Sequence, residues 1–94
     1  MTLHVSDKIR EKLGYRHRVN VKEIYECFNN RLKGLLEDTR EKNKTNPPTM
    51  WFIANTDSDR MLKIVFIKMN DGSMVLKTAY EPNENEVTIY ERYA

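Results

Sequence analysis

The chain has 94 residues, of which 39% are hydrophobic and 32% charged, and its formal net charge is +2. A chain of this length buries one hydrophobic core, so we expect a single domain over residues 1–94, with no room for a separate cofactor domain. No apolar run is long enough to cross a bilayer, and the first residues lack the apolar region of a signal peptide. We therefore expect a cytoplasmic protein that makes no membrane contact.

The residues that bind metals or act as strong nucleophiles are scarce. Cys27 is the one cysteine, and His4 and His17 are the two histidines. They lack the ligand spacing of a structural zinc site, and Cys27 flanks a helical apolar stripe, where cysteine usually packs as a small hydrophobe. The chain has no glycine-rich phosphate loop, no GxSxG motif and no HExxH motif. We expect neither a metal nor a cofactor.

The charge is distributed unevenly along the chain. Residues 1–48 contain 11 Lys and Arg against 7 Asp and Glu, whereas residues 49–94 contain 5 against 7. The basic first half favours a phosphate or an acidic partner, although an excess of this size is also common on solvated surfaces.

Two helices are expected first. In "SDKIREKLG", Ser6 can cap the helix start, Ile9 falls on one face with a leucine four residues later, and Gly14 suits the end. In "VNVKEIYECFNN", Asn20 and Glu23 have the spacing of a capping box, and apolar residues recur along one face.

A sheet is expected next. "LKGLLED" is typical of a short edge strand, and "TREKNKTNPPT" of a long exposed loop. "TMWFIAN", "MLKIVFIKM" and "MVLKTAY" then indicate three strands, which the turns "DSDR" and "NDGS" join into an antiparallel meander.

Pro82 ends the last strand, because proline cannot donate to a strand ladder, and Asn83 and Glu86 form a second capping box. The predicted fold class is therefore α+β, with two N-terminal helices, an antiparallel sheet of three to four strands arranged as a meander, and a short C-terminal helix.

The side chains available for chemistry are mostly cations and phenols. Cleavage of RNA through the 2′-hydroxyl needs a base, a cation near the phosphorus and a proton donor for the leaving oxygen. Lysine, arginine and tyrosine can supply these roles where packing moves their pKa values. Each of these residues could instead have only a structural role, since strand-end lysines reach to water and tyrosines often pack at the edge of a core. The catalytic candidates are Arg60, Lys63, Lys77 and Tyr80, and the RNA-binding candidates are Arg16, Arg18, Arg40 and Lys44.

Several short motifs, taken in order, resemble the BrnT family of bacterial toxins, which belongs to the RelE-like group of small ribonucleases. "VNVKEIYECFNN" resembles its V-x-x-x-E…F segment, and Asp38 with Arg40 resembles its acidic-then-basic pair. "TMWFIANTDSDRMLKIVFI" is similar to its hairpin, and "KTAYEPNENEVTIYE" to its closing pattern, with a small residue at Ala79. The resemblance spans nearly the whole chain.

The resemblance implies two helices, a four-stranded antiparallel sheet and a C-terminal helix. It also implies metal-independent cleavage of mRNA and neutralisation by a cognate antitoxin protein. The family usually has an arginine after the small residue of the last strand, where this chain has Tyr80. If that arginine steadies the phosphate, either Lys77 replaces it here or this chain has lost the activity.

In a ribonuclease of this kind, Arg60 and Lys63 would hold phosphate, Lys77 would stabilise the developing charge, Tyr80 would move a proton and Arg40 would join from the loop. Strand alternation places Tyr80 on the face opposite Lys77 unless the strand bulges.

Two other functions fit the sequence. The first is a non-catalytic interaction module that binds a protein partner or RNA, which predicts an exposed apolar patch or an open strand edge near "LKGLLED". The second is plain RNA binding, with Trp51 or Tyr15 stacking on bases beside the "RHR" segment.

Overall fold

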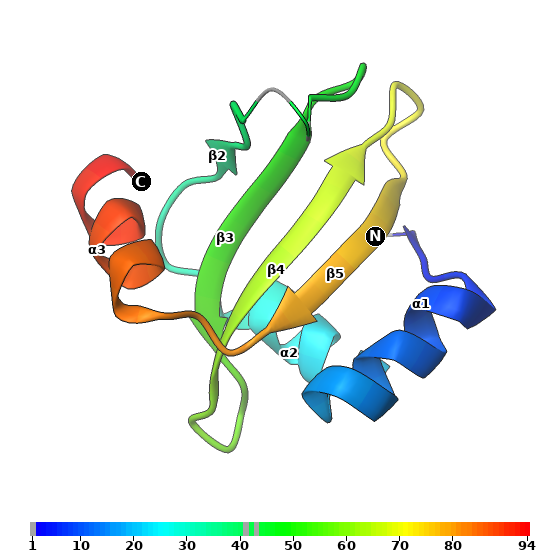
Figure 1. Ribbon diagram of the computed structural model, residues 1–94, viewed down its shortest axis with the longest axis horizontal. Helices are drawn as coiled ribbons and strands as arrows, with labels where there is room; N and C mark the ends of the chain where they lie inside the picture. The colour runs from blue at the N-terminus through cyan, green and yellow to red at the C-terminus, as the bar shows by residue number, and fades with distance from the viewer. Residues whose placement is uncertain (1, 41, 43) are drawn as a thin grey trace.

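The computed structural model describes residues 2–40, 42 and 44–94. These residues form an α+β fold in which three α-helices surround a five-stranded mixed sheet with the strand order β1-β5-β4-β3-β2 (Figure 1). The strands are β1 (Leu3–His4), β2 (Leu36–Glu37), β3 (Thr49–Asn55), β4 (Met61–Lys68) and β5 (Met74–Tyr80).

The three long strands β3, β4 and β5 form the predicted antiparallel meander. Residues with positive φ lie in both connecting turns, Asp59 at 66° and Gly72 at 89°. Aspartate and especially glycine tolerate this left-handed conformation, which is why "DSDR" and "NDGS" were recognisable as turns.

The expectation of a purely antiparallel sheet of three to four strands is wrong. β1 pairs with β5 in the parallel direction, and the Met74 N–H also donates to the Thr2 carbonyl at 2.9 Å. A two-residue strand has no periodicity that a sequence pattern can reveal, which explains why β1 was missed. The predicted short edge strand is present as β2, which pairs with β3.

The helices are α1 (Asp7–Lys12), α2 (Val21–Asn30) and α3 (Glu84–Tyr93). Both predicted capping boxes are present, at the starts of α2 and α3. The expected end of the first helix at Gly14 is wrong, because α1 continues into a π-helical turn, η1 (Leu13–His17). The burial of the Leu13 side chain in the core extends this turn, and a local hydrogen bond from the Val19 N–H to the Leu13 carbonyl at 3.1 Å closes it.

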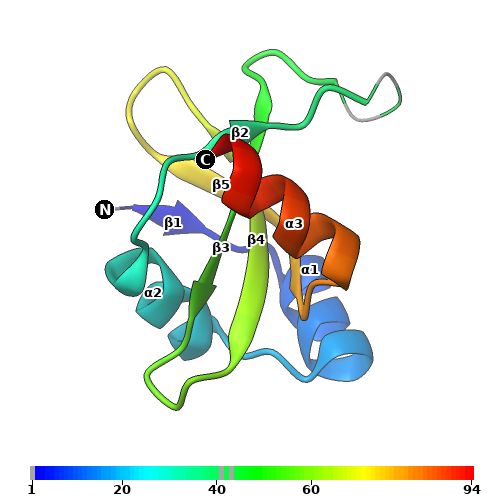
Figure 2. The same cartoon turned by 90° about the vertical axis from the view of Figure 1, so that its left-hand side faces the viewer.

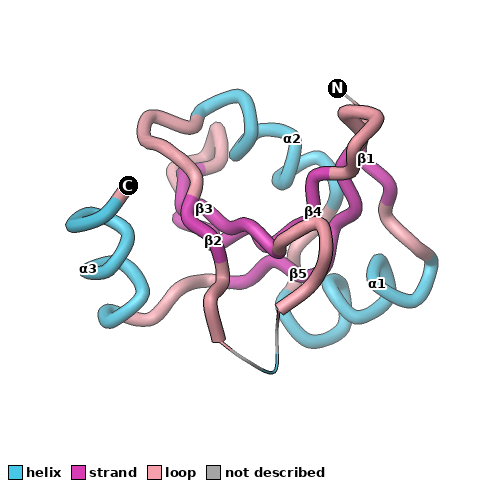
Figure 3. Tube along the Cα trace, turned by 90° about the horizontal axis from the view of Figure 1, so that it is seen from above, coloured by secondary structure: helices cyan, strands magenta, loops and turns pink. Residues whose placement is uncertain are grey.

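The helices lie on different sides of the sheet. α2 covers one face, α3 lies on the opposite face over β3, and α1 packs beside β5 (Figures 2 and 3). The main core lies between the sheet and α2, where the rings of Phe28 and Phe52 are 4.9 Å apart and those of Phe28 and Phe66 are 5.3 Å apart. The α3 side is different, because α3 contacts β3 and a cavity lies over β4 and β5.

Candidate active site

A β-bulge in β5 sets the geometry of the accessible face. Val65 pairs with Thr78 and Phe66 pairs with Leu76, so Lys77 has no partner in this register. An extra residue of this kind shifts the strand's alternation by one position. Lys77 and Tyr80 would otherwise point to opposite faces, but the bulge allows both to line the same cavity. The bulge that the sequence analysis required for Lys77 and Tyr80 to share one face is therefore present.

This cavity has a volume of about 300 Å³ and lies over β4 and β5, on the side of the sheet that faces α3. We call it the central cavity. The charged residues that line it are Lys12, Asp38, Arg40, Lys42, Lys63 and Lys77. Hydroxyl groups also line it, from Thr45, Thr49, Thr78 and Tyr80. Five cations and one carboxylate give the described lining a net positive charge, which favours an anionic ligand.

Lys63 lies at the base of the cavity with 5% of its surface exposed. Its Nζ atom donates to Glu86 Oε2 at 2.7 Å and lies 4.5 Å from the centre of the Trp51 ring. A buried ammonium group is costly unless it is paired, so this ion pair and the aromatic face explain how β4 accommodates a lysine between hydrophobic neighbours.

Glu86 joins three groups on α3 and the sheet. Its Oε2 atom also accepts the Tyr80 hydroxyl at 2.6 Å, and its Oε1 atom accepts the Asn83 N–H at 3.0 Å as part of the α3 capping box. The capping box gave Glu86 a structural explanation in the sequence, which is why its contact with Lys63 and Tyr80 was missed. The same carboxylate starts the helix and holds the floor of the cavity.

These contacts fix the protonation states of the pair. Burial opposes ionisation of Glu86, but hydrogen bonds from Lys63, Tyr80 and the Asn83 N–H outweigh it and lower the pKa of Glu86. Burial and the hydrogen bond to Glu86 raise the pKa of Tyr80 well above its usual value. At neutral pH, the site therefore contains a Glu86 carboxylate and a protonated Tyr80 hydroxyl that donates to it.

Asp38 and Arg40 form the second wall. The Asp38 carboxylate accepts Nε, Nη2 and the backbone N–H of Arg40 at 2.9 to 3.2 Å. The side-chain hydrogen bond from Arg40 lowers the pKa of Asp38. The Arg40 side chain is 62% exposed, so its guanidinium group is both oriented by Asp38 and accessible from the cavity.

His17 lies closer to the site than its place in the sequence suggested. Its ring centre is 5.7 Å from that of Tyr80. Burial, followed by the charges of Lys12 and Arg16, lowers the pKa of His17. The neutral imidazole packs against the Tyr80 ring and supports its orientation.

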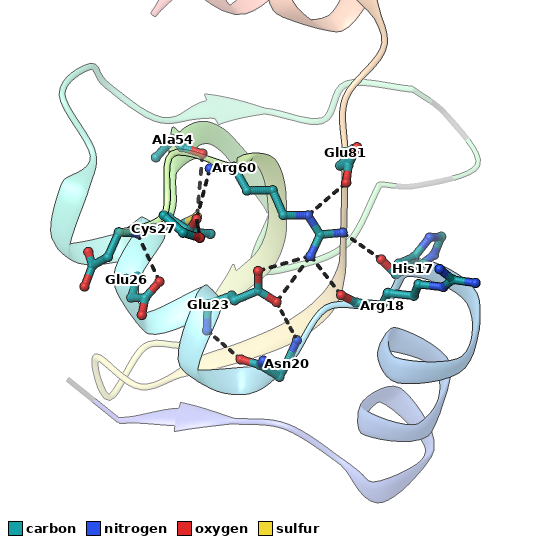
Figure 4. A network of polar contacts seen from close by, with 12 residues as sticks. His17, Arg18, Asn20, Glu23, Glu26, Cys27, Ala54, Arg60 and Glu81 are labelled. Carbon is teal, nitrogen blue, oxygen red and sulfur yellow. Dashed lines mark hydrogen bonds and ion pairs between the residues drawn. The ribbon is translucent and has the colours of Figure 1, made fainter.

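The structure does not bring Arg60 to the central cavity. Its guanidinium group donates to Glu81 at 2.8 Å, to Glu23 at 3.1 Å, and to the carbonyls of His17 and Arg18 at 2.9 and 2.8 Å (Figure 4). These contacts tie η1, α2 and the end of β5 together. These contacts favour a structural role for Arg60 over binding of phosphate.

The other RNA-binding candidates, Arg16, Arg18 and Lys44, do not line the central cavity. Arg16 lines a shallow hollow beside exposed Tyr15, and Arg18 takes a positive φ of 53° at the end of η1. Lys44 is exposed in the segment 38–48. The structure adds two cations that the sequence analysis did not select, Lys12 from α1 and Lys42 from that segment. No local pattern distinguishes them from other surface lysines.

No helix in the described part of the chain is long and apolar enough to cross a bilayer. Across residues 2–40, 42 and 44–94, no three His, Cys, Asp or Glu side chains gather as a metal would require.

The chain matches no protein-family model, and no curated protein shows a significant match to it. A function for this chain therefore has to be argued from the geometry of the central cavity and from the motifs in the sequence.

Replacement of Arg60 tests its structural role. Arg60→Met removes the donor shared by two carboxylates and two carbonyls, so we expect the free energy of unfolding to fall by about 3 kcal/mol in urea denaturation. Arg92→Met, at an exposed position on α3, is the matched control and should change it by less than about 0.5 kcal/mol. An Arg60→Met protein as stable as the wild type would contradict this role.

The Glu86 contacts predict a pH-dependent stability. The pKa of Glu86 is lower in the folded than in the unfolded chain, so its contribution is complete above the ordinary value of about 4.5 and is lost as the pH falls through the folded value. Glu86→Gln should lower the free energy of unfolding by about 2 kcal/mol near neutral pH, and by less in acid. Exposed Glu91→Gln is the control. A stability difference that stays constant with pH would refute the assignment.

Proposed function

We propose that this protein is an endoribonuclease of the toxin type, which cleaves single-stranded regions of mRNA in the central cavity without a metal ion. The observation that supports the proposal is the convergence of Arg40, Lys63, Lys77 and Tyr80 on one cavity, with Glu86 bonded to both Lys63 and Tyr80. Cations, a carboxylate and a hydroxyl are the groups that phosphodiester cleavage through the 2′-hydroxyl requires.

In the proposed reaction, the phosphate binds between Lys77 and Arg40. The 2′-oxygen attacks phosphorus, and its proton passes to the Tyr80 oxygen while the Tyr80 proton moves to Glu86 Oε2 along their 2.6 Å hydrogen bond. The bond from phosphorus to the 5′-oxygen breaks, and the leaving oxygen takes a proton from the Lys77 ammonium group. The products are a 2′,3′-cyclic phosphate and a 5′-hydroxyl, and exchange with water restores both side chains.

Charge stabilisation is expected to contribute more than proton transfer. Lys63 and the Asn83 N–H lower the pKa of Glu86, which makes this carboxylate a weak base. Lys77 and Arg40, by contrast, are placed to stabilise the extra negative charge that develops on the phosphate oxygens. Loss of Lys77 should therefore impair cleavage more than loss of the Tyr80 hydroxyl.

Binding of a protein partner, the antitoxin implied by the resemblance, is the second part of the proposal. A hollow of about 390 Å³ lies between the end of α2 and α3, and residues including Leu32, Met61, Val87 and Tyr90 line it. Leu32 is 96% exposed. Beyond the residues that pair with β2, the edge of β3 is not open: the backbone of Ile53 contacts the Tyr90 hydroxyl, and the Asn55 carbonyl accepts from Asn30 at 3.0 Å. The apolar hollow with exposed Leu32, and not a free strand edge, is the feature that favours a protein partner.

Cleavage by purified protein tests the enzymatic part. A labelled single-stranded RNA should be cut by the wild type in the presence of a metal chelator. Lys77→Ala should lower the cleavage rate by about 100-fold or more, because it removes a cation from the charged transition state. Tyr80→Phe should lower it by about tenfold, because it interrupts the proton relay.

Lys68→Ala is the matched control, since Lys68 is exposed on β4 and does not line the cavity. It should cleave at the wild-type rate. Equal rates for Lys77→Ala and Lys68→Ala would overturn the assignment of the site, and absence of cleavage by the soluble, folded wild type would overturn the enzymatic function.

A further inference from the structure

A second hollow adjoins the central cavity. It has a volume of about 470 Å³ and lies between α3 and the segment that follows β2. Trp51, Ile89 and Tyr93 line it from the sheet and α3. We call it the Trp51 hollow. It shares Asp38, Arg40 and Lys63 with the central cavity, so the two spaces lie side by side.

The boundary between the two spaces is the proposed reaction centre. Tyr80 lines the central cavity and Glu86 lines the Trp51 hollow, and a 2.6 Å hydrogen bond joins the two side chains. In a ribonucleotide, the 2′-hydroxyl lies between the base and the 3′-phosphate. A nucleotide with its 3′-phosphate beside Lys77 and its 2′-hydroxyl at Tyr80 therefore has its base directed into the Trp51 hollow.

The lining suits a flat ring with polar edges. Tyr93 is 66% exposed and presents an aromatic side chain, and the Arg40 guanidinium group is oriented by Asp38 on the opposite wall. Aromatic rings and guanidinium groups are the side chains on which bases stack. Lys63 covers one face of the Trp51 indole, so Trp51 contributes the floor of the hollow and not a stacking surface.

We infer that the Trp51 hollow binds the nucleobase on the 5′ side of the scissile phosphate, with Tyr93 as its stacking residue. This inference rests on the proposed function, because the position of the 2′-hydroxyl links the two spaces. The new element is the assignment of Tyr93 and the Trp51 hollow to substrate binding. It also makes the enzyme selective for a ribonucleotide that can leave its stack, as in a single strand.

The chain provides its own reporter. Trp51 is the one tryptophan in the sequence, so its fluorescence reports on the hollow. We would titrate the protein with adenosine 3′-monophosphate and, separately, with inorganic phosphate. The nucleotide should change the emission saturably, whereas phosphate alone should leave most of it unchanged. Tyr93→Ala should raise the Kd of the nucleotide by about fivefold or more, because stacking is lost.

Tyr25→Ala is the matched control, because Tyr25 is also exposed, at 43%, but lies on α2 on the far side of the sheet. It should bind the nucleotide with the wild-type Kd. The inference is overturned if Tyr93→Ala and Tyr25→Ala bind equally, or if inorganic phosphate reproduces the full change in emission.

RNA cleavage by the same proteins separates the two claims. Cleavage by the wild type together with a Tyr93-independent Kd overturns the hollow and supports the ribonuclease. A Tyr93-dependent Kd without any RNA cleavage supports a nucleotide-binding hollow and overturns the ribonuclease. Absence of both overturns both.

Discussion

One carboxylate, that of Glu86, connects the fold to the candidate chemistry. It accepts hydrogen bonds from Lys63 on β4, from Tyr80 on β5 and from the backbone at the start of α3. A lysine buried in a sheet needs a counterion within hydrogen-bonding distance, because the desolvation of an unpaired charge costs several kcal/mol. α3 therefore has to begin where its third residue, Glu86, reaches Lys63 near the start of β4. The position of the helix, the shape of the cavity and the orientation of Tyr80 all follow from this requirement.

The bulge at Lys77 is the second constraint. Without an extra residue in β5, Lys77 would face α2 and the core while Tyr80 faced the cavity. The bulge leaves the core contacts of Leu76 and Ala79 in place, since both are fully buried against the α2 side. It also adds Lys77 to the face that holds Lys63. A small irregularity in one strand thus gives the accessible face its concentration of positive charge, at a point where α3 does not cover the sheet.

Much of the fold could be predicted because its signals are local. The two capping boxes, the turn at Gly72 and the apolar strand β4 each depend on residues close together in the sequence. The parts that were missed depend on distant contacts. β1 is a strand because β5 lies beside it, and η1 extends past Gly14 because Leu13 is buried and Arg60 binds the carbonyl of His17. The site shows the same division: Lys63, Lys77 and Tyr80 could be selected by residue type, whereas Lys12, Lys42 and the second role of Glu86 depend on tertiary structure. Arg60 was also selected by residue type, but it binds Glu23, Glu81 and backbone carbonyls and does not reach the cavity.

In the reaction that we propose, the substrate's own 2′-hydroxyl is the nucleophile. The most direct measurement is an assay of two RNAs of the same sequence, one unmodified and one carrying a 2′-methoxy group at the cleaved nucleotide, with the ends of the products identified by mass spectrometry. With a 2′-hydroxyl nucleophile, we expect the unmodified RNA to yield a 2′,3′-cyclic phosphate and a 5′-hydroxyl, and the modified RNA to stay intact at that position. Cleavage of the modified RNA at the same position, or a product with a 5′-phosphate, would contradict this mechanism.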